Sequence, residues 1–229
     1  MSIVFRSAVL VNLALLGNCQ LSDSGQPSGR EGFAELIPGS SVQTEVRYFS
    51  SENFVGEVID GYQAPVIYLT LEAYEALRAV LVEAETLGFG IMVFDAYRPQ
   101  KAVDHFVRWA EDLSDTRMKA QYYPEVEKQH LFRDGYIASR SGHSRGSTLD
   151  LTLFELETGK ELDMGTAFDF FDKSSWGESE AVTVQQQSNR ALLRMLMTQH
   201  GFRPLREEWW HFTLENEPYP ETYFNFPVR

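Results

Sequence analysis

Apolar side chains recur at the spacing of an amphipathic helix in three parts of the chain. The first helix is predicted from Leu71 to Leu87, with Thr70 placed to cap its start and Gly88 placed to end it. A second helix is predicted to begin at Pro99, because proline is favoured as the first helical residue. A third helix is predicted over residues 186–200. The fold should therefore contain at least three helices.

Shorter apolar stretches predict strands over residues 90–97, 148–154 and 209–214. Strands and helices do not alternate regularly along the chain, which favours an α+β fold. We expect a central, mainly antiparallel sheet flanked by helices. Residues 20–32 are polar and rich in Ser, Gly and Pro, so they predict a flexible linker. No repeat or second linker follows, and residues 33–229 are predicted to form one domain.

The first nineteen residues have the features of an export signal. A short cationic start precedes an apolar run from Ala8 to Leu16, which is far shorter than the ~18 residues of a membrane span. Cys19 resembles the lipidated first residue of a bacterial lipoprotein, although Asn18 stands where Gly, Ala or Ser is usual. An N-terminal strand or helix packed on the domain is the alternative. The expected location is therefore periplasmic or membrane-anchored, with Cys19 as a possible lipid anchor.

The composition and charge of the chain exclude some classes of function but do not identify one. The 229 residues are 43% hydrophobic and 23% charged, as in an ordinary globular protein. The chain has 33 acidic against 20 basic side chains, a net charge of −13. An acidic protein without a basic stripe repels phosphate backbones, so we expect no nucleic-acid partner. A single cysteine excludes an internal disulfide.

Two histidines lie in segments that suit metal chemistry. His143 belongs to a loop of small residues, 141–146, which leads to Asp150 at the start of a predicted strand. A loop histidine and a strand carboxylate seven residues apart can converge if the loop folds back. Imidazole and carboxylate groups suit Zn²⁺, and His211 is the natural third ligand.

A catalytic zinc keeps three protein ligands and leaves its fourth position for water. Glu208, three residues before His211, is placed to act as the general base. Residues three apart point to opposite faces of a regular strand, so Glu208 must lie at the start of the strand or at a bulge. The alternatives are that Glu208 is a solvated charge and that Trp209 and Trp210 are core residues.

The motifs Ser141-x-His143-x6-Asp150 and Glu208-Trp209-Trp210-His211 resemble those of the VanX-type D-alanyl-D-alanine dipeptidases. These are zinc enzymes that share a fold with zinc D,D-carboxypeptidases. The resemblance extends from about Val46 to the C-terminus. Further blocks carry it: Asn53-Phe54-x-Gly56, Asp60-Gly61-Tyr62, Tyr97-Arg98-Pro99, Gly165-x-x-Phe168-Asp169-Phe170, Glu217-Pro218-Tyr219-Pro220 and Tyr223-Phe224-x-Phe226-Pro227-Val228.

The resemblance implies a role for each matching residue. One zinc per chain would be held by His143, Asp150 and His211, with Glu208 as general base. Arg98 matches an arginine that stabilises the developing oxyanion. Without the resemblance, Arg98 would be interpreted as part of a surface ion pair or as a residue at the start of a helix. The matched positions that hold the dipeptide are Ser141, Tyr48 and Asp169.

The implied activity is hydrolysis of D-alanyl-D-alanine to two D-alanines. The best-known enzymes of this kind deplete a cytoplasmic cell-wall precursor, whereas an exported form would serve turnover or salvage of wall-derived dipeptide. The closest alternative is a zinc D,D-carboxypeptidase or peptidoglycan endopeptidase with a more open cleft. A wall-peptide binding module without turnover is a further alternative, which the presence of Glu208 and Arg98 disfavours.

Overall fold

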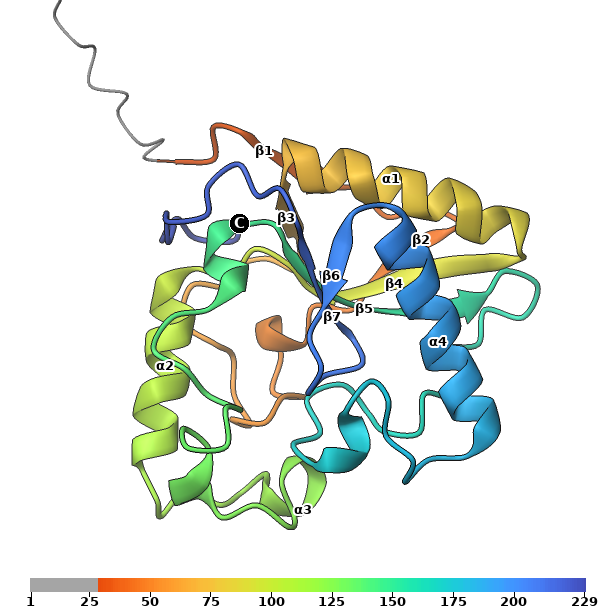
Figure 1. The fold of residues 1–229 in the computed structure, drawn as a ribbon. Helices are drawn as coiled ribbons and strands as arrows, with labels where there is room; N and C mark the ends of the chain where they lie inside the picture. Colours follow the sequence, from red (N-terminus) through yellow and green to blue (C-terminus); the bar gives the residue numbers. More distant parts are fainter. Residues whose placement is uncertain (1–28) are drawn as a thin grey trace, which may run out of the picture.

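A computed structural model describes residues 29–229 (Figure 1). The predicted signal over residues 1–19, Cys19 and most of the predicted linker lie outside the described residues. Within residues 29–229, no helix is long and apolar enough to cross a membrane.

The core of the fold is a five-stranded sheet with the order β2-β4-β5-β7-β6. Only the edge pair β2 and β4 is parallel, and the other pairs are antiparallel. This confirms the predicted α+β fold with a mainly antiparallel sheet. The strands are β2 (Val42–Thr44), β4 (Phe89–Asp95), β5 (Thr148–Glu155), β7 (His211–Leu214) and β6 (Phe202–Pro204), and a separate antiparallel pair is formed by β1 (Phe33–Leu36) and β3 (Ile67–Thr70).

Two long helices pack against the sheet, and the other two helices lie apart from them. The helices α1 (Leu71–Thr86) and α4 (Val184–Gln199) pack against each other and contact β4 and β6, respectively. Figure 1 shows α2 (Gln100–Glu111) and the short α3 (Lys119–Tyr122) in the other half of the molecule. Single 3-10 turns are formed by η1 (Arg47–Phe49), η2 (Lys128–His130), η3 (Gly142–Arg145) and η4 (Lys173–Ser175).

The helix predictions are confirmed to within two residues. The Thr70 side chain accepts a hydrogen bond from the backbone of Ala73, and Gly88 adopts φ 84° after the last turn of α1. Pro99 is the N-cap of α2 and not its first helical residue. Helix α4 begins at Val184, two residues earlier than predicted, because Thr183 forms a capping box there.

Two strand boundaries differ from the predictions by two residues, and two others differ by one residue. The strand predicted over residues 90–97 is β4, which ends at Asp95. The strand predicted over residues 209–214 begins only at His211, because the preceding residues form a turn. Both two-residue differences fall at the same end of the sheet, where the chain leaves it to form the candidate site.

A β-bulge in β4 decides which face Asp95 occupies. Val93 pairs with Leu151, but two residues later Asp95 pairs with Asp150, so Phe94 is the extra residue. An uninterrupted register would place Asp95 opposite Leu149, on the face of the β5 leucines. The bulge therefore moves the Asp95 carboxylate to the face that carries Asp150.

Candidate active site

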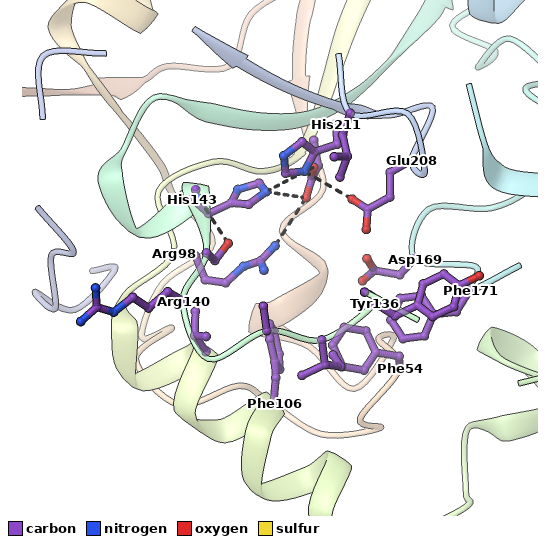
Figure 2. Close-up of a pocket in the computed structure, with 18 of the residues that line it drawn as sticks. Phe54, Arg98, Phe106, Tyr136, Arg140, His143, Asp169, Phe171, Glu208 and His211 are labelled. Atoms are coloured by element: carbon purple, nitrogen blue, oxygen red, sulfur yellow. Dashed lines mark hydrogen bonds and ion pairs between the residues drawn. The ribbon is translucent and has the colours of Figure 1, made fainter. Parts of the chain in front are cut away.

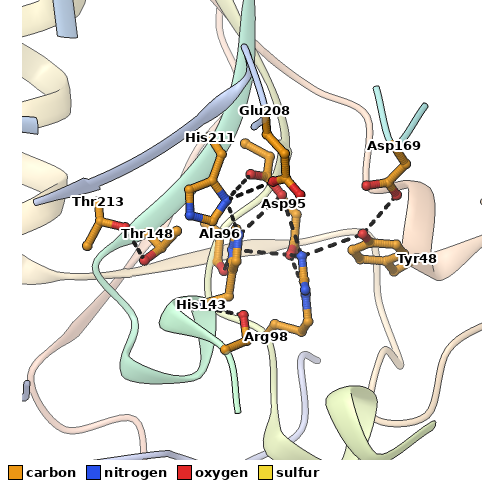
Figure 3. Close-up of polar contacts among 12 residues, drawn as sticks. Tyr48, Asp95, Ala96, Arg98, His143, Thr148, Asp169, Glu208, His211 and Thr213 are labelled. Carbon is orange, nitrogen blue, oxygen red and sulfur yellow. Dashed lines mark hydrogen bonds and ion pairs between the residues drawn. The ribbon is translucent and has the colours of Figure 1, made fainter. Parts of the chain in front are cut away.

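The three predicted metal ligands lie together at one end of the central sheet (Figure 3). His143 comes from η3, Asp150 from β5 and His211 from the first position of β7. His143 Nε2 lies 3.3 Å from Asp150 Oδ2, and His211 Nδ1 lies 3.0 Å from Asp150 Oδ1. The two imidazole nitrogens are 3.3 Å apart. One ligand atom from each residue is therefore available to a single ion.

The surroundings of His143 determine which of its nitrogens faces the other ligands. Its Nδ1 lies 2.7 Å from the carbonyl oxygen of Ala96, which can only accept a hydrogen bond. The proton therefore sits on Nδ1, and the lone pair of Nε2 points at Asp150. Two acceptors that face each other at 3.3 Å repel unless a cation or a proton lies between them.

The donor set fits a zinc ion. Two imidazole nitrogens and one carboxylate match the ligands of catalytic zinc sites with an open fourth position. Asp150 is buried, yet its Oδ1 accepts no well-formed hydrogen bond from the described residues. A buried carboxylate oxygen normally has a partner, and a metal ion at this position would supply it.

Protonation of the ligands follows from their mutual contacts. Burial alone would raise the pKa of Asp150, but His143 and His211 lower it overall. Burial alone would lower the pKa of His211, but the adjacent carboxylates of Asp150 and Glu208 raise it to about 9. The site without a metal therefore holds a proton on His211 at neutral pH, and this proton occupies the place of a cation.

Glu208 lies in the turn that precedes β7, as its role requires. Its Oε2 is 3.3 Å from His211 Nδ1, and its carbonyl oxygen accepts a hydrogen bond from the His211 backbone. Residues three apart in a regular strand would point to opposite faces, but Glu208 is not in the strand. The residues before His211 form a turn, so Glu208 and His211 can face the same point. Trp209 and Trp210 are buried, as their core alternative anticipated.

Arg98 is a largely buried group at the site, with 11% of its side chain exposed, and not a surface ion pair. Its Nε and Nη2 lie 2.9 and 2.8 Å from Asp95 Oδ2, and its Nη2 is 3.5 Å from both Asp150 Oδ2 and the Tyr48 hydroxyl. Burial acts to lower the pKa of Arg98, but Tyr48 and Asp95 raise it above its usual value. The guanidinium is thus a permanent positive charge beside the ligands.

Asp95 organises the site, although no motif in the sequence indicated a role for it. Its carboxylate is fully buried, accepts a 2.6 Å hydrogen bond from the Tyr62 hydroxyl and binds Arg98. It also lies 3.4 Å from His143 Nδ1. The available signal was an acidic residue at the end of an apolar strand segment, three positions before Arg98.

The far wall of the site contains the residues predicted to hold a substrate. The Tyr48 hydroxyl donates a 2.8 Å hydrogen bond to Asp169 Oδ2. Burial, together with the nearby Asp150, raises the pKa of the Asp169 carboxyl. Asp169 has φ 60°, the one positive φ outside glycine in the described part of the chain. Such a conformation persists where the surrounding structure imposes it.

Ser141 lies at the edge of the same space and has a structural contact of its own. It is the N-cap of η3, and its Oγ accepts a hydrogen bond from the His143 backbone. The two glycines of this loop have different surroundings. Gly142 lines the cavity, whereas Gly146 has φ 85° and lies against Phe33.

These groups face one cavity of about 220 Å³ (Figure 2). That volume is below the roughly 300–1,000 Å³ of pockets that take drug-sized ligands. One side carries the charged groups, and aromatic rings close the other. In Figure 2 those rings are Phe54, Phe106, Tyr136 and Phe171.

A family model described as D-ala-D-ala dipeptidase matches residues 32–229. The chain belongs to this dipeptidase family. Two dipeptidase relatives show how far the likeness extends. A D-alanyl-D-alanine dipeptidase of Enterococcus faecalis is 44% identical over 194 residues, which cover 85% of this chain and 95% of the relative. One of Streptomyces coelicolor is 43% identical with the same coverage.

A more distant dipeptidase of Escherichia coli is 34% identical over 173 residues, which cover 76% of this chain and 79% of the relative. Membership of the dipeptidase family agrees with the resemblance seen in the motifs. The match also begins before Val46, so it includes β1 and β2.

Proposed function

We propose that this protein hydrolyses D-alanyl-D-alanine to two D-alanines with one zinc ion per chain. The observation that carries this proposal is the convergence of His143, Asp150 and His211 on one point, with Glu208 3.3 Å from His211. The matching relatives, which bear the name of this activity, support the choice of substrate.

His143 Nε2, Asp150 and His211 Nδ1 would hold the zinc ion. Bound zinc acts as a Lewis acid toward the scissile carbonyl and lowers the pKa of a coordinated water from about 15.7 to near 7. Ala96 fixes the His143 tautomer that ligation requires, so the chain prepares this ligand before the metal binds.

Glu208 would remove the proton from the attacking water and return it to the leaving amine as the C–N bond breaks. One water molecule is consumed, and each product leaves as a complete amino acid. The Arg98 guanidinium would face the carbonyl oxygen as negative charge develops on it. Its contacts with Asp95 hold this charge in place before the substrate arrives.

A free dipeptide has an ammonium group and a carboxylate that the cavity would recognise separately. Asp169 would accept the ammonium group, with its carboxylate oriented by the Tyr48 hydroxyl. Ser141 would offer its hydroxyl to the substrate from the edge of the cavity. The small, ring-lined space supports a preference for a dipeptide over a longer chain.

Export is part of the proposal, because residues 1–19 have the pattern of a secretory signal and Cys19 that of a lipid attachment point. An exported dipeptidase would act in the turnover or salvage of wall-derived dipeptide. Fractionation of cells that express the full chain tests this. Recovery of the uncleaved N-terminus from the cytoplasm would contradict it.

The decisive assay compares D-alanyl-D-alanine with its N-acetylated form, using zinc-loaded protein. We expect release of D-alanine from the free dipeptide and little from the acetylated one. Glu208→Ala, tested in parallel, controls for contaminating peptidases. Cleavage of only acylated or longer peptides would instead favour a D,D-carboxypeptidase or endopeptidase.

A further inference from the structure

Arg190 is a buried cation that the proposed reaction does not use. It extends from α4, and only 2% of its surface is exposed. Its guanidinium binds four neutral oxygens of one segment. Nε donates to Met164 O at 2.7 Å, Nη1 to Ser174 O at 2.9 Å and Trp176 O at 2.8 Å, and Nη2 to the Thr166 hydroxyl at 3.4 Å.

Burying a cation is costly, and for Arg190 the hydrogen bonds to these four oxygens and the nearby charge of Asp163 offset that cost. Burial lowers the pKa of Arg190 to about 10, and the side chain remains charged at neutral pH. Its planar fork presents five donors in fixed directions on three nitrogens, whereas a lysine has three donors on a single nitrogen.

The four acceptors lie on both sides of Asp169 in the sequence. Met164 and Thr166 precede Asp169, whereas Ser174 and Trp176 follow it. The guanidinium therefore closes the segment 164–176 into a loop with Asp169 near its middle. The constraint explains how Asp169 is held at φ 60°, a conformation that a free loop would leave.

The same cluster reaches the turn that carries Glu208. The Thr166 hydroxyl also accepts a 2.9 Å hydrogen bond from Trp209 Nε1, and the Trp209 backbone donates to Ser175 O at 3.0 Å. Trp209 is the residue next to Glu208. Arg190 thus links the wall that carries Asp169 to the turn that carries Glu208, without lining the cavity itself.

We infer that Arg190 is a positioning residue for recognition of the substrate ammonium group, acting through Asp169. This inference rests on the proposed dipeptidase function. The strength of an ammonium–carboxylate contact depends on distance and direction. Misplacement of a substrate-positioning group by 1 Å can lower the reaction rate about 100-fold. Loosening the segment 164–176 would shift Asp169 relative to the ligands, which belong to η3, β5 and β7.

The test is the variant Arg190→Lys, with Arg194→Lys as the matched control. Arg194 lies one turn further along α4 and pairs with the exposed Glu178. For Arg190→Lys we expect a rise in KM for D-alanyl-D-alanine of about tenfold or more with a smaller change in kcat. The control variant Arg194→Lys should keep the KM and kcat of the unsubstituted protein. Urea unfolding and zinc content are measured for each variant.

A second substrate separates positioning from general loosening. Propionyl-D-alanine lacks the ammonium group, so Asp169 has nothing to bind on it. We expect Arg190→Lys to change its hydrolysis much less than that of D-alanyl-D-alanine. Because Arg190 acts through Asp169, the double variant Arg190→Lys/Asp169→Asn should have the KM of Asp169→Asn alone.

Several results would overturn the inference: an unchanged KM, an equal loss on both substrates, or additive effects in the double variant. If Arg190→Lys does not fold, Thr166→Val removes one shared acceptor and should raise KM in the same direction, and an unchanged KM there overturns the inference equally. Failure of the unsubstituted protein to release D-alanine would instead refute the proposed function.

Discussion

Asp150 and His211 are direct cross-strand partners in the register of β5 and β7, with His211 Nδ1 3.0 Å from Asp150 Oδ1. On the other side of β5, Asp95 of β4 is the cross-strand partner of Asp150. Three charged or ligating groups therefore form a row across neighbouring strands, where backbone hydrogen bonds limit their motion. A site built on strands in this way is more rigid than one built on loops.

Glu208→Ala should retain zinc but lose most of its hydrolytic rate. The side chain lies beside the ligands without being one of them, and a general base contributes roughly 10²–10⁴-fold. His211→Ala provides the contrast, because removal of a ligand should reduce bound zinc. Metal analysis together with D-alanine release distinguishes the two variants. Near-normal turnover by Glu208→Ala would show that another group removes the proton.

Arg98→Lys should lower kcat by about 10²–10³-fold with a smaller effect on KM, because the loss concerns charge that develops during the reaction. Lysine cannot reproduce the two contacts that Arg98 makes with Asp95, so its charge would be displaced. Arg140→Lys is the control, since Arg140 is exposed and lies over Tyr223 at the edge of the cavity. Equal losses in the two variants would argue against a specific role for Arg98.

Zinc affinity of the metal-free protein should fall as the pH is lowered from 9. The adjacent carboxylates of Asp150 and Glu208, acting against burial, raise the pKa of His211 to about 9, and zinc must displace that proton. Below this pKa, His211 alone should weaken the apparent affinity about tenfold per pH unit. Competition with a chelator between pH 7 and 9 measures the slope. An affinity independent of pH over this range would contradict the assignment of His211.

Gly146→Ala should reduce the free energy of unfolding by more than about 1 kcal/mol. Gly146 has φ 85°, which costs an alanine roughly 1–2 kcal/mol, and an added Cβ would lie 2.2 Å from the Phe33 ring. The substitution should also weaken zinc binding, since Gly146 ends the turn that carries His143. Gly39→Ala is the control, because nothing lies within 4 Å of its added Cβ. Urea denaturation compares the two, and equal stabilities would contradict the prediction.

The parts of the fold that could be predicted are those with capping residues or apolar periodicity within their own segment of the sequence. Helices α1 and α4 have capping residues and apolar periodicity within their own sequences, so their positions were predicted to within two residues. Strands β1, β2, β3 and β6 have three or four residues each and were not predicted. Segments this short carry too little periodicity, and they form strands only because partners lie beside them.

Residue types and spacings within short motifs were enough to predict the α+β class, the family and the residues expected at the site. How these residues act together depends on the tertiary structure. The bulge at Phe94 moves Asp95 to the face of Asp150, and the turn before β7 brings Glu208 to His211. Arg190 closes the loop around Asp169 from a distant helix. Such relationships depend on register and packing between segments far apart in the chain, which no local pattern specifies.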